Sequence, residues 1–261
     1  MFALLCDLDG VVWLSHQAIP GSVEAIAAAR AAGHRVLFVT NNSGSRIEDV
    51  EASLAAIGIA AAGDVLSSAQ AAAMLLQPGE RALVAGGPGI VQALEARGVV
   101  VCPASDVDAG AMVDAVVVGW HRTFDFDGLT RAARAIRLGA RLIGTNDDAT
   151  YPTPDGPIPG GGSILAAVRT ASGVEPDIAG KPYAPMAALV REVIGADATT
   201  HAVMVGDRPS TDGLFARALG CRYAQVWSGV TPKGSVVDPH PDVEGDDLAA
   251  VVTALGIAMQ R

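Results

Sequence analysis

The sequence predicts an α/β protein with a doubly wound parallel sheet (Rossmann-like) that is interrupted by an inserted α/β domain. Short apolar runs alternate with longer helical segments through most of the 261 residues. This alternation is typical of a parallel sheet covered by helices. The alternation restarts near Arg81, which indicates an insertion. Half of the residues are hydrophobic, so a chain of this length can bury a substantial core.

The first part of the chain should contain two strand–helix pairs. ALLCDL (3–8) is short and apolar, as in a buried strand, and residues 20–33 form a helix with Pro and Gly at its start and Gly33 after its end. RVLFVT (35–40) predicts the next buried strand, and residues 45–58 predict the next helix.

The inserted part should run from residue 80 to residue 178. Its expected strands are 81–86, 114–120 and 141–146, and its expected helices are 88–98, 126–139 and 163–173. A Pro- and Gly-rich stretch, 151–162, precedes the last of these helices.

The first domain should resume at residue 179. The expected elements there are a helix at 184–195, a strand at 201–207, a helix at 210–220 and a strand at 222–227. The predicted division is therefore 1–79 and 179–261 for one domain, and 80–178 for the inserted domain.

Asp7 and Asp9 lie in the apolar run LLCDLDGVVW, where an unpartnered buried carboxylate would be costly. Residues two apart in a strand point to the same side. If both aspartates lie where the first strand ends, they serve one site beyond the carboxyl edge of the sheet, where open α/β sheets bind ligands. Gly10 then permits a sharp exit from the strand. The alternative is a strand-end turn with two solvated carboxylates.

Three further polar segments follow predicted strands or precede a predicted helix. Thr40, Asn41 and Asn42 end the second strand and carry groups that suit phosphate oxygens, although turn formation or helix capping is their usual role. Lys181 lies in AGKP, and a lone lysine is usually a solvated charge. Asp207 ends another buried strand, and Asp212, five residues later, could simply cap the next helix.

Together these segments resemble the four-motif set of the haloacid dehalogenase (HAD) superfamily. DLDGVVW, TNNS, GKP and GDRPSTD occur in the family's order, and the match covers the whole chain. The insert, with VVVGWHRTFDF, TNDDATYP and PGGGS, resembles the cap domain of the NagD-like and para-nitrophenyl phosphatase branch. Arg208 stands where some members carry Asn. Four motifs in order are far more specific than any single one.

The resemblance implies catalytic roles for the motif residues. Asp7 would be the nucleophile that forms an aspartyl-phosphate, and Asp9 the general acid and then the base for the hydrolytic water. Lys181 would neutralise the phosphoryl oxygens and keep Asp7 ionised. Two carboxylates repel a phosphate dianion, so a cation is required, and oxygen ligands favour Mg²⁺.

The resemblance also implies the binding residues. Mg²⁺ would be held by the side chain of Asp7, the backbone carbonyl of Asp9 and the side chain of Asp207. Asp212 would position Lys181 or a metal-bound water. The phosphate would be oriented by Thr40 and Asn41, with Asn42 beside them. Tyr151 is expected in a cap loop whose Pro and Gly content fixes the backbone without regular structure. There it would face the substrate, or would instead pack against the cap's own sheet.

The expected function is a Mg²⁺-dependent phosphatase for a small phosphorylated metabolite. The alternatives are a phosphomutase, which would pass the phosphoryl group to a sugar, and a non-catalytic sensor of a phosphometabolite. A sensor would not need a nucleophile, and mutases of this superfamily usually carry a different cap placed earlier in the chain. Caps in this branch often mediate dimers, so a homodimer is an option that no feature of the sequence proves.

Composition limits the partners and the location. The formal charge of −10 and the absence of a basic run argue against nucleic acid as a partner. No apolar stretch reaches about 18 residues, so no membrane span is expected. Cys6, Cys102 and Cys221 are widely spaced and odd in number, which indicates reduced thiols and a cytoplasmic location. Cys6 adjoins the nucleophile but should belong to the core.

Overall fold

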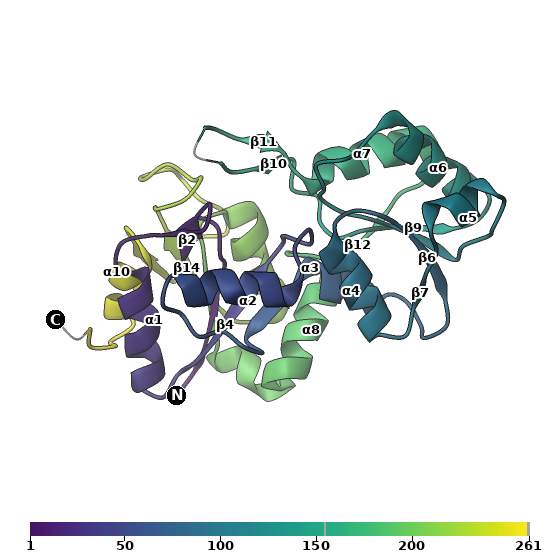
Figure 1. The fold of residues 1–261 in the computed structure, drawn as a ribbon. Coiled ribbons are helices and arrows are strands. Elements are labelled where there is room, and N and C mark those ends of the chain that lie inside the picture. Colours follow the sequence, from purple (N-terminus) through teal and green to yellow (C-terminus); the bar gives the residue numbers. More distant parts are fainter. Residues whose placement is uncertain (154, 260–261) are drawn as a thin grey trace.

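The computed structural model describes residues 1–153 and 155–259, and its helices cover two parallel sheets (Figure 1). The larger sheet has the order β15-β14-β13-β1-β4-β5, and all its neighbouring strands pair parallel. These strands are β1 (Ala3–Cys6), β4 (Arg35–Thr40), β5 (Val65–Ser67), β13 (Val203–Gly206), β14 (Arg222–Val226) and β15 (Val243–Gly245). The predicted doubly wound α/β fold is confirmed.

Strand β1 lies in the middle of the larger sheet because both of its faces are apolar. Leu4 and Cys6 pack into one hydrophobic cluster with α1 (Ser22–Ala31), α2 (Ile47–Ala56) and α10 (Leu248–Ala254). Leu5 points to the opposite face and packs with α3 (Ser68–Ala73), α8 (Ala184–Ile194) and α9 (Leu214–Leu219). Helices therefore cover both faces of the sheet, as its continuous apolar strands require.

The smaller sheet is built from residues 81–178, which we call the inserted unit; the remaining described residues are the main unit. Its strand order is β12-β9-β8-β6-β7, again parallel throughout. The strands are β6 (Arg81–Ala85), β7 (Val100–Val101), β8 (Ala115–Val118), β9 (Arg141–Gly144) and β12 (Asp177–Ile178). The helices are α4 (Pro88–Ala96), α5 (Ala104–Asp108), α6 (Phe126–Arg137) and α7 (Gly161–Ser172).

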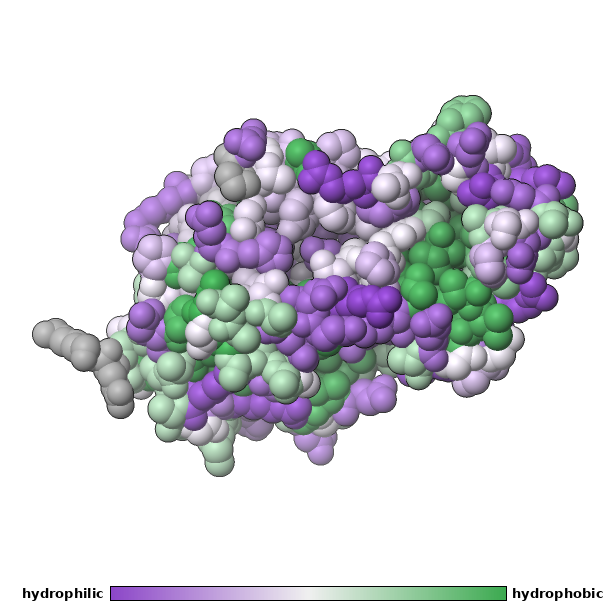
Figure 2. All heavy atoms as spheres, viewed as in Figure 1, coloured by the Kyte–Doolittle hydropathy of each residue, from purple (hydrophilic) through white to green (hydrophobic). Residues whose placement is uncertain are grey.

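One hydrophobic cluster runs through both units. It includes Ala72 of α3 in the main unit and Leu94 of α4 in the inserted unit, and both side chains are fully buried. On the face shown in Figure 2, hydrophilic residues surround α2, and a hydrophobic patch lies over the region of α4 and the strands beside it. The inserted unit is thus packed on the main unit through an apolar contact as well as joined to it by the chain.

Two short hairpins extend from the sheets. The first pairs β2 (Trp13–Leu14) with β3 (Gln17–Ala18), just after the aspartates. The second pairs β10 (Thr150–Tyr151) with β11 (Ile158–Pro159) and reaches from the inserted unit towards the main unit (Figure 1). The expectation that Tyr151 lies in a loop without regular structure is therefore wrong. Thr and Tyr favour extended backbone, and Tyr151 pairs with Ile158 across the hairpin.

Other differences from the expected elements are local. Residues Pro209–Gly213 form a π-helical turn before α9, so the helix expected at 210–220 begins later. A 3₁₀ helix at Ala196–His201 precedes β13, which shortens the strand expected at 201–207. Within the described part of the chain, no helix combines the length and the apolar character needed to cross a membrane.

Candidate active site

The candidate site lies at the carboxyl ends of three adjacent strands of the larger sheet. Asp7 directly follows β1 and continues its ladder, since its N–H donates to the Val205 carbonyl at 2.9 Å. Asp207 directly follows β13, and Thr40 is the last residue of β4. Because β13, β1 and β4 are neighbours in the sheet, these side chains meet at one edge.

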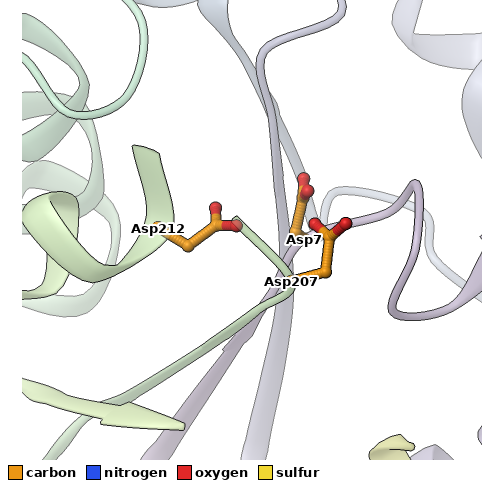
Figure 3. Close-up of side chains that lie close together, drawn as sticks. All are labelled: Asp7, Asp207 and Asp212. Atoms are coloured by element: carbon orange, nitrogen blue, oxygen red, sulfur yellow. The ribbon is translucent and has the colours of Figure 1, made fainter. Parts of the chain in front are cut away.

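Three carboxylates form the negatively charged part of the site. Asp7, Asp207 and Asp212 each offer an oxygen, and these oxygens lie within 4.8 Å of one another (Figure 3). Asp212 comes from the π-helical turn after β13 and approaches from the side. Burial first, and then the charges of Asp212 and Asp7, raise the pKa of Asp207 to about 7. A cation bound here would relieve this repulsion.

The donor set fits a hard divalent cation such as Mg²⁺, because it consists of oxygens alone. Asp207 has little room: a Cβ at Gly10 would lie 2.6 Å from Asp207 Oδ2, and one at Gly229 only 1.9 Å. Asp207 Oδ2 also accepts the N–H of Val230 at 2.7 Å. Both oxygens of Asp212 have protein donors, so Asp7 and Asp207 are the more available ligands, and their predicted role in holding the metal stays a prediction.

Lys181 supplies the positive charge at the centre of the cluster. Its side chain is 2% exposed, and Nζ lies 2.8 Å from Asp7 Oδ1 and 2.7 Å from Asp212 Oδ1. Burial alone would lower the pKa of this lysine, but Asp212 and Asp7 raise it above its ordinary value. Lys181 is therefore a permanent cation that holds the Asp7 carboxylate in one position.

Asp9 has a different environment from Asp7. Its Oδ1 is buried and has no hydrogen-bond partner in the described residues, and its Oδ2 accepts a long hydrogen bond from the Tyr151 hydroxyl at 3.5 Å. Burial, and then the neighbouring charge of Asp7, raise the pKa of Asp9 to about 7. A carboxyl group whose pKa lies near neutrality can hold a proton in the resting site and give it up during a reaction.

The residues after β4 form a tight turn around the same cavity. Thr40 Oγ1 accepts the N–H of Asn42 at 3.0 Å, and Asn42 Oδ1 accepts the N–H of Gly44 at 2.9 Å. The Asn41 amide is bonded to the backbone of Lys181. Thr40, Asn41 and Asn42 all line the cavity that contains Asp7. Their predicted role in binding phosphate stays a prediction.

Tyr151 faces this cavity from the inserted unit. Its ring is stacked on Trp120, with 5.3 Å between ring centroids and 27° between planes. Trp120 is itself fixed by a hydrogen bond from Nε1 to the Pro159 carbonyl at 3.1 Å. The two rings form an aromatic wall of the cavity that also contains Asp7 and Asp207.

Several residues that line the cavity were not predicted as site residues, among them Trp120, Asn146, Asp148 and Arg208. Each of these four follows the end of a parallel strand: β8, β9 or β13. Their position after a strand end is the same sequence signal that marks Asp7 and Asp207. Cys6, in contrast, is fully buried in the core as expected, and burial raises the pKa of its thiol to about 12.

Comparison with known proteins agrees with this arrangement. The family described as haloacid dehalogenase-like hydrolase matches residues 4–100, and a HAD-hydrolase-like family matches residues 178–253. The D-glycerol 3-phosphate phosphatase of Mycobacterium tuberculosis is 40% identical over 91% of this chain, which spans 66% of that enzyme's length. The acid sugar phosphatase of Staphylococcus saprophyticus is 33% identical, with 90% of this chain and 89% of that protein covered.

A solved structure extends the similarity to the metal. Glycerol phosphate phosphatase from Mycobacterium tuberculosis in complex with magnesium has a TM-score of 0.84 and 36% identity, with 95% of this chain and 75% of that one covered. The chain belongs to the haloacid dehalogenase-like hydrolases. Its similarity to the solved p-nitrophenyl phosphatase of Archaeoglobus fulgidus (TM-score 0.84, 28% identity, 97% of this chain and 98% of that one) and to a putative nagD protein (TM-score 0.85, 29% identity, 98% of each) supports the NagD-like and para-nitrophenyl phosphatase branch. The predicted enzyme class, a magnesium-dependent hydrolase of phosphoric monoesters, is confirmed by these relatives.

Proposed function

We propose that this protein hydrolyses a small phosphorylated metabolite through an aspartyl-phosphate on Asp7. The observation that carries the proposal is the position of Lys181 Nζ, which lies 2.8 Å from Asp7 and 2.7 Å from Asp212. The lysine side chain is buried between these two carboxylates. This contact orients one Asp7 oxygen and leaves the other free to attack phosphorus. Transfer to Asp7 and then to water divides one displacement into two easier steps.

Asp9 would serve both steps. In its protonated form it donates a proton to the leaving oxygen of the ester, and as a carboxylate it then accepts a proton from the hydrolytic water. Its pKa of about 7 suits both directions near neutral pH. Mg²⁺, held by Asp7, the backbone carbonyl of Asp9 and Asp207, would supply positive charge to the phosphoryl oxygens. Thr40, Asn42 and the backbone of Asn41 would orient those oxygens, and Asp212 would position Lys181.

The inserted unit would act as a cap domain over the site. The two sheets agree with the predicted division into 1–79 with 179–261, and 80–178, and this division remains our proposal. A cap excludes bulk water and large substrates from the chemistry. The cavity combines the aromatic pair Trp120 and Tyr151 with polar groups, so we propose a polyol or sugar phosphate as the substrate class, like the substrates that name the relatives. A cytoplasmic location and a homodimer stay predictions.

The test of this function is phosphate release from a panel that includes para-nitrophenyl phosphate, glycerol 3-phosphate and sugar phosphates. Activity should require Mg²⁺: exhaustive chelation with EDTA should abolish turnover, and added Mg²⁺ should restore it, because the substrate dianion otherwise meets uncompensated carboxylates. Full activity after chelation would contradict the metal's role. Binding of the esters without release of phosphate would indicate a sensor, and transfer to a second sugar would indicate a mutase.

Asp9→Asn should slow poor leaving groups more than good ones. An alkoxide needs the proton that Asp9 gives, whereas para-nitrophenolate leaves without one. For the wild type, kcat/KM with an alkyl phosphate should also fall as the pH rises above about 7, because the protonated share of Asp9 decreases. The variant should lose that decline. Equal slowing of both esters would argue against the acid role.

We place the Tyr151 ring, which lines the cavity, beside the leaving group, so Tyr151→Ala should change kcat/KM unequally among phosphorylated metabolites that share only the phosphoryl group. A several-fold spread in the ratio of variant to wild type is expected across the panel. Tyr183→Ala is a control of the same residue type, because the Tyr183 hydroxyl bonds Asp147 instead. A uniform change, or only a lower melting temperature, would mean that Tyr151 is structural.

A further inference from the structure

Asp148 connects the inserted unit to two segments of the active site. It follows β9 in the sequence TNDD and is largely withdrawn from solvent, with 19% of its side chain exposed. Its Oδ2 accepts a hydrogen bond from Asn41 Nδ2 at 2.9 Å, and its Oδ1 lies 3.3 Å from Arg208 Nη1. Asn41 follows β4 and Arg208 follows β13, so the single Asp148 carboxylate contacts the segments that follow two strands of the larger sheet.

The amide of Asn41 has no free N–H in this arrangement. Nδ2 donates one hydrogen to Asp148 and the other to the Lys181 carbonyl at 3.0 Å. Oδ1 accepts the backbone N–H of Lys181 at 2.7 Å. Asn41 therefore holds the backbone of Lys181 on both its N–H and its C=O, and Asp148 fixes the orientation of the amide that does so.

The surrounding backbone is packed too closely for the amide to turn. A Cβ at Gly180 would lie 2.5 Å from Asn41 Oδ1 and 2.6 Å from the Thr145 carbonyl. Asn146 Nδ2 donates to the Asn41 carbonyl at 2.7 Å, and Asn146 Oδ1 accepts the N–H of Asp148 at 3.2 Å. Residues 145–148 of the inserted unit thus contact Asn41 through both its backbone and its side chain.

We propose that Asp148 is a positioning residue: with Arg208 as its counter-ion, it fixes Asn41 and thereby the backbone of Lys181, so that the inserted unit sets the position of the central cation. This inference rests on the proposed function and adds a second task to the inserted unit, beyond enclosing the substrate. Lys181 Nζ lies between Asp7 and Asp212, so a small displacement of its backbone would weaken both contacts.

The charge of Arg208 explains why a carboxylate can occupy this place. Burial raises the pKa of Asp148, whereas the hydrogen bond from Asn41 and the charge of Arg208 lower it. The backbone N–H of Arg208 donates to Asp212 Oδ2 at 3.1 Å, so the same residue also contacts the partner of Lys181. Asp148, Asn41, Lys181, Asp212 and Arg208 therefore form a closed ring of contacts around the site.

The test compares variants that remove different parts of this ring. Asp148→Ala removes the acceptor for Asn41 and should lower kcat/KM by about 10-fold to 100-fold, the usual effect of removing a partner that orients a site residue. Asp148→Asn keeps an acceptor oxygen and should recover most of that loss. Arg208→Gln removes only the counter-ion, and combining it with Asp148→Asn should add little to either change, because both remove the same ion pair.

The kinetic pattern distinguishes positioning from other roles. The loss in Asp148→Ala should be equal for para-nitrophenyl phosphate and an alkyl phosphate, since Lys181 acts on the phosphoryl group that they share. Inhibition by inorganic phosphate should weaken as well. Asp147→Ala, which alters the neighbouring carboxylate that bonds Tyr183, should stay within about twofold of the wild type.

Two outcomes would overturn the proposal. One is an unequal loss for the two esters, which would show that Asp148 contacts the leaving group. The other is unchanged kcat/KM and phosphate binding with only a lower melting temperature, which would show a structural role. If the wild type hydrolyses no ester, the proposed function fails. In that case, calorimetric binding of inorganic phosphate with Mg²⁺, weaker in Asp148→Ala and restored in Asp148→Asn, still supports the positioning role, and equal binding in all variants rejects it.

Discussion

Asp7→Asn should lower kcat by at least about a thousandfold while the protein stays folded. The amide is nearly the same size as the carboxylate, but it lacks the charged oxygen that attacks phosphorus, and loss of the attacking group in covalent catalysis has effects of this order or larger. The change also removes one negative charge beside Asp207, whose pKa is raised by burial and by Asp212 and Asp7. The melting temperature of the metal-free variant should therefore equal or exceed that of the wild type.

The measurement is steady-state phosphate release, with circular dichroism to confirm the fold. Asp197→Asn is a suitable control, because Asp197 lies in the 3₁₀ helix before β13 and is exposed. This control should keep wild-type kcat. If Asp7→Asn retains more than about a tenth of wild-type kcat, with deamidation excluded by mass spectrometry, Asp7 is not the nucleophile.

The sequence could predict the larger sheet because its strands are short, apolar and separated by helices. RVLFVT at 35–40 coincides with β4, because a run of six residues rich in Val and Phe is too short for a buried helix and has the length of a strand. Short elements that lack such an apolar run were not predicted from the sequence. The helix at Ser68–Ala73 contains mostly alanine, so its sequence shows no apolar periodicity that would distinguish a buried face from an exposed one. Its start depends on the capping pair Ser67 and Gln70, and it is stabilised by packing against α4 and α8.

The sequence predicted most of the candidate site residues that come from the main unit, but few of those that come from the inserted unit. Asp7 and Asp207 follow, and Thr40 ends, strands that are neighbours in the sheet, so strand order alone places them together. Asp148 and Arg208 lie 60 residues apart and meet only because the inserted unit packs over the main unit. That packing depends on a hydrophobic cluster shared by both units, which no periodicity within either unit can indicate.

Lys181→Met should lower kcat by about a hundredfold to a thousandfold, the range measured when a preorganised electrostatic contact is removed. Methionine fills the space of the lysine stem but leaves Asp7 and Asp212 without their counter-ion. In the wild type, burial raises the pKa of Asp212 to about 6, and the charge of Lys181 opposes that rise. Without the lysine, the pKa of Asp212 should rise further, and the ionised form should destabilise the fold.

The pH dependence of the melting temperature of Lys181→Met provides a second measurement. A carboxyl group whose pKa is raised on folding stabilises the folded state when protonated, and this contribution is lost as the pH rises through the raised pKa. The melting temperature of Lys181→Met should therefore fall further below the wild type at pH 8 than at pH 5. Lys233→Met is the matched control, because the sequence contains one other lysine, and Lys233 is 67% exposed in its pair with Asp246. That variant should change neither kcat nor the pH dependence of melting. A pH-independent loss of stability in Lys181→Met, with kcat near that of the wild type, would mean that Lys181 only fills space between the two carboxylates.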